Sequence, residues 1–198
     1  MKIAECLPYM GIIIAIISLM GWLLENLCLA VTKGYIDNSN MRLPFLLGYG
    51  LLVTAFALCF GTPDNICFFG AETDITGRFS WINYFIIAFV IICVGEHILG
   101  TLVEKICGLE YWNYDWVPLK ISKYTTIPTS IGFSFILTLF TGYGYPWIMK
   151  LIMGLNKIAA AVISIVSMVV LSVDFFRSFS AMYKKRRLNE IWRITLKR

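Results

Sequence analysis

The stretch "MGIIIAIISLMGWLLENLCLAVT", residues 10–32, decides the fold class. It is almost entirely apolar and exceeds the roughly 20 residues that a helix needs to cross a bilayer. Glu25 is its one charged residue. The run is too long for the apolar part of a signal peptide, and Glu5 and Glu25 are out of place in one. We therefore expect a retained membrane-spanning helix.

The composition of the whole chain extends this interpretation. Of 198 residues, 59% are hydrophobic and 15% are charged, with a mean hydropathy of +0.75. Soluble domains average about 25% charged residues. Further apolar runs cover residues 44–61, 84–106, 127–140 and 158–176. The sequence predicts an all-α, polytopic helical membrane protein with about five transmembrane helices. The segment "TGYGYPWIMKLIMGL" after the fourth run extends that helix, lies in the interface or forms a sixth span.

Basic residues predict the orientation, because short loops rich in Lys and Arg stay in the cytoplasm. With five spans and an external N-terminus, 13 bases fall on the inner side and 4 on the outer side. We expect the N-terminus outside and the C-terminus in the cytoplasm. Residues 1–176 then form a transmembrane domain, and residues 177–198 form a basic tail at the interface with anionic lipids. A nucleic-acid-binding role would need a folded reading head, and none is visible.

Two stretches of the chain resemble each other. "GWLLENLC" from Gly21 and "GTLVEKIC" from Gly100 share Gly, Leu, Glu and Cys at a constant offset of 79 residues. The following runs both read Pro-x-x-x-Gly-aromatic, from Pro44 and from Pro128. The pattern predicts that spans one and two recur as spans three and four, in the same orientation, as a parallel internal repeat. Chance similarity is the alternative.

The third predicted span carries the largest number of ionisable groups. Glu96, Gly100 and Glu104 follow i, i+4, i+8 spacing and so share one helix face, and His97 lies next to them. A carboxylate at a helix centre costs about 2.5–3.5 kcal/mol on insertion scales, so lipid is a poor neighbour for this stripe. We expect it to face a cavity or the other spans.

Glu25, Arg42, Trp112 and Tyr114 complete the set of candidate substrate-binding or cavity-lining residues. Arg42 precedes the second span and is a candidate partner for Glu25 or Glu104 in a charge-assisted hydrogen bond. Two interpretations remain open. The groups line a polar cavity for a substrate, protons or an ion, or they are structural ion pairs that fix helix register. No spacing of His, Cys or Glu supports a metal site, and no cofactor is predicted.

The stretch "LEYWNYDWVPLKISKY", between the third and fourth runs, is rich in Trp and Tyr and contains Trp112 and Tyr114. Such residues concentrate where the bilayer meets water. It is either an interfacial belt or a short amphipathic element on the cytoplasmic face that docks a partner.

These motifs resemble a known family, the permease-like bacterial membrane proteins named "Putative ABC-transporter type IV". The resemblance covers roughly residues 15–150, although the family usually has Trp-Asp-Tyr where this chain has Trp-Asn-Tyr. It is carried by Gly21, Trp22, Glu25, Arg42, Gly48, Tyr49, Gly50, Gly100, Glu104, Gly108 and the "WNYD" stretch at 112–115. The resemblance implies a multi-pass, permease-like protein of the bacterial inner membrane.

Three functions are compatible with these features. The first is a transport subunit whose cavity contains Glu25, Glu96 and Glu104. The chain lacks the Gly-x-x-x-x-Gly-Lys-Ser/Thr phosphate loop, so ATP-driven transport would need a separate ATPase subunit. The second is a membrane enzyme that uses the carboxylates and His97 on a lipid-like substrate. The third is a non-catalytic accessory protein, and assembly as a homo-oligomer is open in each case.

Overall fold

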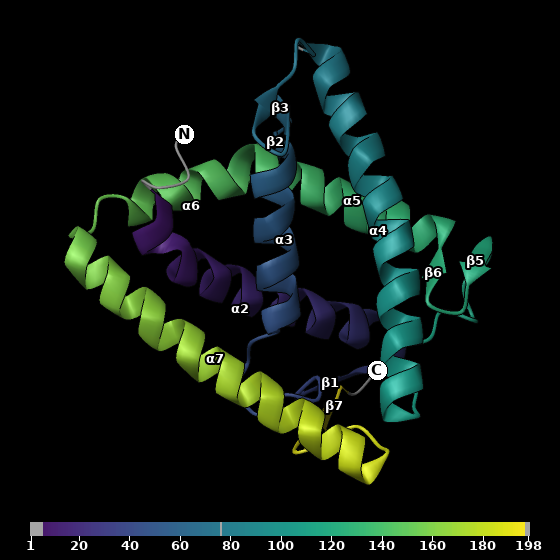
Figure 1. The fold of residues 1–198 in the computed structure, drawn as a ribbon. Helices are drawn as coiled ribbons and strands as arrows, with labels where there is room; N and C mark the ends of the chain where they lie inside the picture. The colour runs from purple at the N-terminus through teal and green to yellow at the C-terminus, as the bar shows by residue number, and fades with distance from the viewer. Residues whose placement is uncertain (1–5, 76, 197–198) are drawn as a thin grey trace. The chain divides into compact units, whose positions relative to one another are not determined.

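The computed structural model describes residues 6–75 and 77–196, most of which are helical (Figure 1). The helical segments are η1 (Leu7–Tyr9), α2 (Met10–Lys33), α3 (Leu47–Phe60), α4 (Arg78–Cys107), α5 (Ile127–Leu139), the π-helical η2 (Phe140–Gly144), α6 (Tyr145–Ile152) and α7 (Lys157–Lys185). The prediction of an all-α polytopic fold is confirmed.

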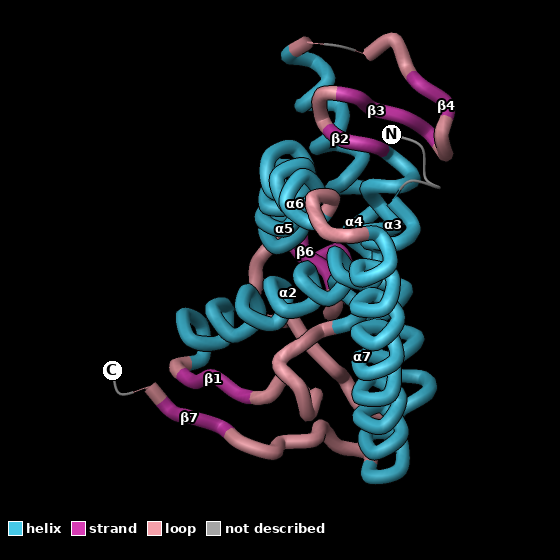
Figure 2. Tube along the Cα trace, turned by 90° about the vertical axis from the view of Figure 1, so that its left-hand side faces the viewer, coloured by secondary structure: helices cyan, strands magenta, loops and turns pink. Residues whose placement is uncertain are grey.

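The strands are short and lie at helix ends (Figure 2). β1 (Tyr35–Asp37) pairs antiparallel with β7 (Arg193–Thr195), so the C-terminal segment lies beside the chain that leaves α2. The others form a three-stranded sheet of β2 (Gly61–Thr62), β3 (Asn65–Phe68) and β4 (Ala71–Glu72), and a hairpin of β5 (Lys120–Ser122) and β6 (Thr125–Thr126).

Among the described residues, four helices are long and apolar enough to cross a membrane, within Leu7–Lys33, Phe79–Cys107, Ile127–Ile152 and Lys157–Lys185. The helix at the predicted second span is α3, with 14 residues. At 1.5 Å per residue it covers about 21 Å, less than the hydrocarbon thickness. The segment after the fourth run extends that helix, because η2 joins α5 to α6 without a break.

Local chemistry explains where the helices begin and end. α2 ends at Gly34 and α4 at Gly108, both with positive φ values that favour glycine, 72° and 68°. Thr126 caps α5 in a reciprocal arrangement with Thr129, and the Asn156 side chain accepts hydrogen bonds from the first amides of α7. These signals are local and therefore visible in the sequence.

The chain divides into two compact units. The first joins the residues up to Thr54 with those from Ile148 onward. Here α2 packs along α7, and their backbones meet at Gly11, where a Cβ atom would lie 2.3 Å from the carbonyl oxygen of Ser164. A core of Ile14, Leu47 and Leu171 lies beside this crossing.

The second unit spans Ala55–Trp147 and is built around the packing of α4 on α5. Its buried core contains Phe56, Ile66, Tyr84 and Ala88. The Tyr84 hydroxyl donates to the carbonyl of Gly61 at 2.8 Å, which ties α4 to the start of the three-stranded sheet.

The residues of the predicted tail take two conformations. α7 continues past residue 176 to Lys185, and β7 forms near the end of the chain. The interfacial position of this tail stays a prediction. So does the internal repeat, although each stretch that was predicted to repeat lies in a different unit.

Candidate functional site

The three residues of the predicted stripe on α4 lie against the segment that begins α5. The hydroxyls of Thr125 and Ser130, both fully buried, lie beside the carboxylate of Glu96. The Oε2 atom of Glu96 is buried and has no hydrogen-bond partner among the described residues. A buried carboxylate oxygen without a partner is costly inside a membrane, so this position needs an explanation beyond packing.

The face of α5 that continues from Ser130 is polar and buried. It consists of Ser130, Ser134 and Thr138, at i, i+4 and i+8, and it continues to Thr141 in η2. Ser134 donates to the Ser130 carbonyl and Thr141 to the Leu137 carbonyl, so both hydroxyls have partners one turn away. The hydroxyl of Thr138 is buried and has no hydrogen-bond partner among the described residues. The second unit therefore contains a polar stripe inside two membrane-spanning helices.

Glu104, at the end of the same α4 face, is fully engaged. Its Oε1 lies 2.6 Å from Nζ of Lys123, and its Oε2 accepts from the Tyr124 hydroxyl at 2.7 Å. Lys123 also contacts Oε1 of Glu110 at 2.8 Å. This carboxylate fastens the β5–β6 hairpin to α4. The chemistry fits a structural ion pair better than a free binding group.

Trp112 and Tyr114 support the same hairpin. The indole of Trp112 donates to the carbonyl of Tyr124 at 2.9 Å, and the amide of Tyr114 donates to the carbonyl of Lys123 at 2.8 Å. The ring of Tyr124 lies against Gly100, where a Cβ atom would be 2.2 Å from Cγ of the ring. Burial, reinforced by the bond to Glu104, raises the pKa of Tyr124 above its ordinary value.

The ion pairs of Lys123 predict a pH dependence of stability. Hydrogen bonds to Glu104 and Glu110 raise the pKa of Lys123, and the bond from Lys123 lowers the pKa of Glu110. The stabilisation is therefore present between the unfolded-state pKa values of about 4.3 and 10.4, and it is lost as the pH falls or rises beyond them through the folded-state values. We expect Lys123→Met to lower the melting temperature equally between about pH 6 and 9, and less at about pH 3.

Thermal melting of the purified protein in detergent checks this. A difference between wild type and Lys123→Met that is as large at acidic pH as at neutral pH would contradict an electrostatic origin.

His97 is exposed on α4 and does not lie on the face that holds Glu96 and Gly100 against α5. Among the glycines of the predicted motif, Gly21 packs on Tyr49, and Gly50 packs on Ile14 and its neighbour Ser18. Gly48 has open space around it.

In the first unit, Glu25 is half-buried and lies beside the Ser39 hydroxyl, with Asp37 nearby. Asn26, next to it, accepts from the amide of Asp37 at 2.8 Å. Arg42 belongs to none of the ion pairs found among the described residues, so the predicted Arg42–Glu25 pair is not formed there. Pairing of Arg42 with Glu104, which lies in the other unit, stays a prediction.

Trp22, another residue of the motif, packs edge-on against Trp192 with ring centroids 6.2 Å apart. Its indole nitrogen is buried and has no hydrogen-bond partner within 6–75 and 77–196.

The sequence did not predict a hydrogen-bonded network of three asparagines that positions the loop carrying Arg42. The three are Asn38, Asn40 and Asn189. The side-chain nitrogen Nδ2 of Asn38 donates to the carbonyls of Met41 and Asn189, at 2.8 and 2.7 Å. Asn40 Oδ1 accepts from the amide and side-chain nitrogens of Asn189. This network holds the loop before α3 against the C-terminal segment, and Arg42 lies beside α7 as a result. The Asn-rich "DNSN" stretch at 37–40 was the available signal.

Apolar helices of membrane-spanning length, with polar groups buried between them, define a multi-pass integral membrane protein. The chain belongs to the family described as "Putative ABC-transporter type IV", whose model matches residues 12–179. It is therefore a membrane protein of a transport-related family, and the match includes most of α7. No curated protein matches the chain, and no solved structure matches it.

Proposed function

We propose that this protein is a permease-like transport subunit of the bacterial inner membrane, in which Glu96 and the polar face of α5 bind the transported solute or a coupled proton. One observation carries the proposal: Glu96 Oε2 is buried in a membrane-spanning helix and has no hydrogen-bond partner among the described residues.

The energetics favour a functional role for Glu96 over a structural one. A carboxylate near a helix centre costs about 2.5–3.5 kcal/mol on insertion scales, and such groups persist where they serve a pathway or a proton relay. For Glu104, the ion pair with Lys123 and the hydrogen bond from Tyr124 offset that cost. Among the described residues Glu96 belongs to no ion pair, and the neutral hydroxyls of Thr125 and Ser130 lie beside it. Its free oxygen is available to a cation, a proton or a polar solute.

The energy source and the orientation complete the proposal. The sequence contains no phosphate loop, so we assign ATP hydrolysis to a separate subunit. The distribution of 13 inner and 4 outer bases supports an external N-terminus and a cytoplasmic C-terminus. Assembly of two or more copies of the chain around the transport path is part of the same proposal.

The test begins with purification of the tagged full chain from native membranes together with bound proteins. We expect an ATP-hydrolysing partner, and we expect Glu96→Gln to lower ATP turnover at least about tenfold without reducing the recovery of that partner. Asp74→Asn, which removes an exposed carboxylate of the same unit, is the matched control and should keep wild-type turnover.

The reactivity of the Glu96 carboxylate can also be tested without measuring ATP turnover. Dicyclohexylcarbodiimide, which enters membranes, should modify Glu96 and leave Glu104 unmodified, because both oxygens of Glu104 are engaged. Peptide mass spectrometry reads the site of modification. The proposal fails if no ATP-hydrolysing partner is recovered, or if Glu96→Gln turns over ATP as the wild type does.

A further inference from the structure

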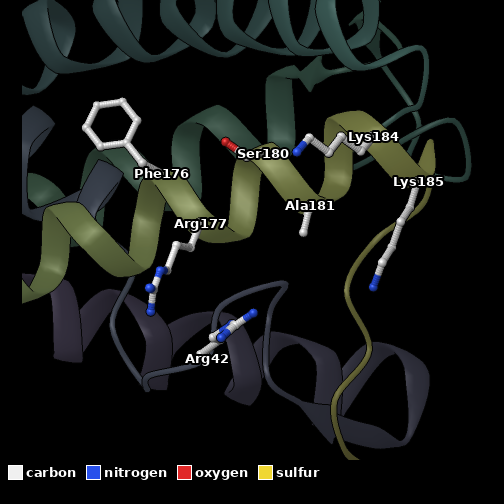
Figure 3. A pocket seen from close by; sticks show the side chains of 7 residues that line it. All are labelled: Arg42, Phe176, Arg177, Ser180, Ala181, Lys184 and Lys185. Atoms are coloured by element: carbon white, nitrogen blue, oxygen red, sulfur yellow. The ribbon is translucent and has the colours of Figure 1, made fainter.

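A strongly basic pocket lies in the first unit, apart from Glu96. Its volume is about 620 Å³. It is lined by Arg42, Phe176, Arg177, Ser180, Ala181, Lys184 and Lys185 (Figure 3). Figure 3 shows three of the four basic side chains on α7 and the fourth, Arg42, on the loop that precedes α3. A second hollow of about 530 Å³ shares Arg42, Ala181 and Lys185 with it and adds Arg187 and Ser178.

The cations of this pocket have no acidic partners. Among the described residues, no ion pair includes Arg42, Arg177, Lys184 or Lys185. Two carboxylates lie nearby, and one of them, Glu190, also lines the second hollow. Asp174 accepts from the amide of Leu43 at 3.2 Å, and Glu190 pairs with Arg193 at 3.1 Å.

The four side chains are exposed and of one sign, so together they create a positive potential that favours an anion at this place. Ser178, in the adjoining second hollow, adds a second observation. It is 2% exposed, lines the second hollow, and its hydroxyl has no hydrogen-bond partner in the described part of the chain.

The pocket is held open by buried hydrogen bonds. Asn38 and Asn40 are both at least 94% buried and bind Asn189, which in turn donates to the carbonyl of Ser178 on α7 at 2.8 Å. These bonds fix the loop that carries Arg42 beside α7 before any ligand arrives. Binding therefore does not require ordering of the loop, which lowers its entropic cost.

The apolar surface next to the pocket indicates the kind of anion. On α7, Val169, Val173 and Phe176 are exposed and lie on one face at helical spacing, and Ser180 and Lys184 continue that face into the pocket. An apolar track that ends in a basic pocket matches an amphiphile with an anionic head. A free anion would use only the basic end.

We propose that this pocket binds the phosphate headgroup of an anionic phospholipid, with the acyl chains along the exposed face of α7. Arg42 and Arg177 supply paired N–H donors to the phosphate oxygens, and Lys184 and Lys185 supply point charges. The Ser180 hydroxyl donates a further hydrogen bond. The proposal is independent of the role of Glu96.

The experiment is a lipid titration of the purified full chain in neutral detergent, read by native mass spectrometry. Phosphatidylglycerol and phosphatidylcholine are the two lipid probes, and inorganic phosphate is the soluble one. We expect phosphatidylglycerol to bind at least about fivefold more tightly than phosphatidylcholine, and Arg42→Gln and Lys184→Gln each to weaken it about fivefold. Inorganic phosphate should fail to displace it at equal concentration, because it lacks the acyl chains.

Controls separate the pocket from net charge and from misfolding. Lys157→Gln removes one charge at the other end of α7 and should change binding less than about twofold. Arg42→Lys should stay closer to the wild type than Arg42→Gln does. If the Arg42→Gln variant does not fold, the lipid affinity of the Lys184→Gln variant alone tests the proposal, because Lys184 is exposed at the end of the helix.

Four results would overturn the proposal. Equal affinity for the two lipids would remove the role of the headgroup charge, and wild-type binding by both pocket variants would place the lipid elsewhere. Displacement by inorganic phosphate would identify a free anion as the ligand. Loss of a copurified protein in the pocket variants, with lipid binding intact, would identify a protein-docking surface instead.

Discussion

Replacing Gly100 with alanine is expected to lower the free energy of unfolding by about 2–3 kcal/mol, the range typical of forced overpacking. The added Cβ atom would lie 2.2 Å from Cγ of the Tyr124 ring and 2.5 Å from its Cδ1 atom. The ring cannot retreat easily, because Tyr124 is 2% exposed and its hydroxyl is bonded to Glu104 at 2.7 Å. Relief of the clash would separate α4 from the β5–β6 hairpin.

Gly95 offers a matched control on the same helix. A Cβ atom there would meet nothing within 4 Å, so Gly95→Ala should be neutral or stabilising by up to about 1 kcal/mol through helix propensity. Thermal unfolding of both variants in detergent measures the difference. Equal melting temperatures for the two would mean that the contact between Gly100 and Tyr124 does not constrain the fold.

The apolar runs located the helices, but hydropathy alone misplaced some of their ends. The length of the apolar run predicted a span at 84–106, yet α4 begins at Arg78. The polar residues in the first turns of α4 interrupt the apolar run, but they do not oppose helix formation. α7 likewise continues past residue 176 to Lys185. Arg and Lys are good helix formers, so hydropathy underestimates the length of a helix that leaves the membrane.

The charges show a different limit. Helical spacing predicted that Glu96, Gly100 and Glu104 share a face, and all three lie against residues 124–130. The partner of Glu104 could not be read from spacing, because Lys123 reaches it through the hairpin between α4 and α5. Its sequence neighbour Lys105 is exposed and belongs to no ion pair among the described residues.

Arg42 was more difficult to place, because its environment depends on residues near the opposite end of the chain. The loop before α3 is polar, which ordinarily indicates a solvated turn. Its asparagines are instead buried against Asn189, about 150 positions away in sequence. A single sequence gives no information on such a pairing, and the predicted bond to Glu25 rested on the position of Arg42 at the start of the second span, at the membrane depth expected for the carboxylate.

The buried asparagines lead to the second large effect. Asn38 is 3% exposed, and its side chain makes three hydrogen bonds. It donates to the carbonyls of Met41 and Asn189, and it accepts from the amide of Ile191 at 2.9 Å. Asn38→Ala removes all three and leaves buried backbone groups without partners, each at a cost of about 1–3 kcal/mol. We expect a loss of about 3–4 kcal/mol, since relaxation and water will recover part of the total.

Two variants calibrate this loss. Asn38→Asp keeps the acceptor for Ile191 but turns a buried carboxylate oxygen toward the carbonyls of Met41 and Asn189, so at neutral pH it should destabilise at least as much as alanine. Asn156→Ala removes an exposed helix cap in the same unit and should cost only about 1 kcal/mol. Thermal melting in detergent ranks the three variants.

Amide hydrogen exchange then locates the damage within the molecule. The Asn38 bonds hold the segment that leads into β7, so Asn38→Ala should accelerate exchange at the paired amides of β1 and β7. Exchange in α4 and α5 should stay as in the wild type, because those helices belong to the other unit. Unchanged exchange at β1 and β7, or equal acceleration in both units, would show that Asn38 does not anchor the C-terminal segment. In that case Arg42 would owe its place beside α7 to another contact.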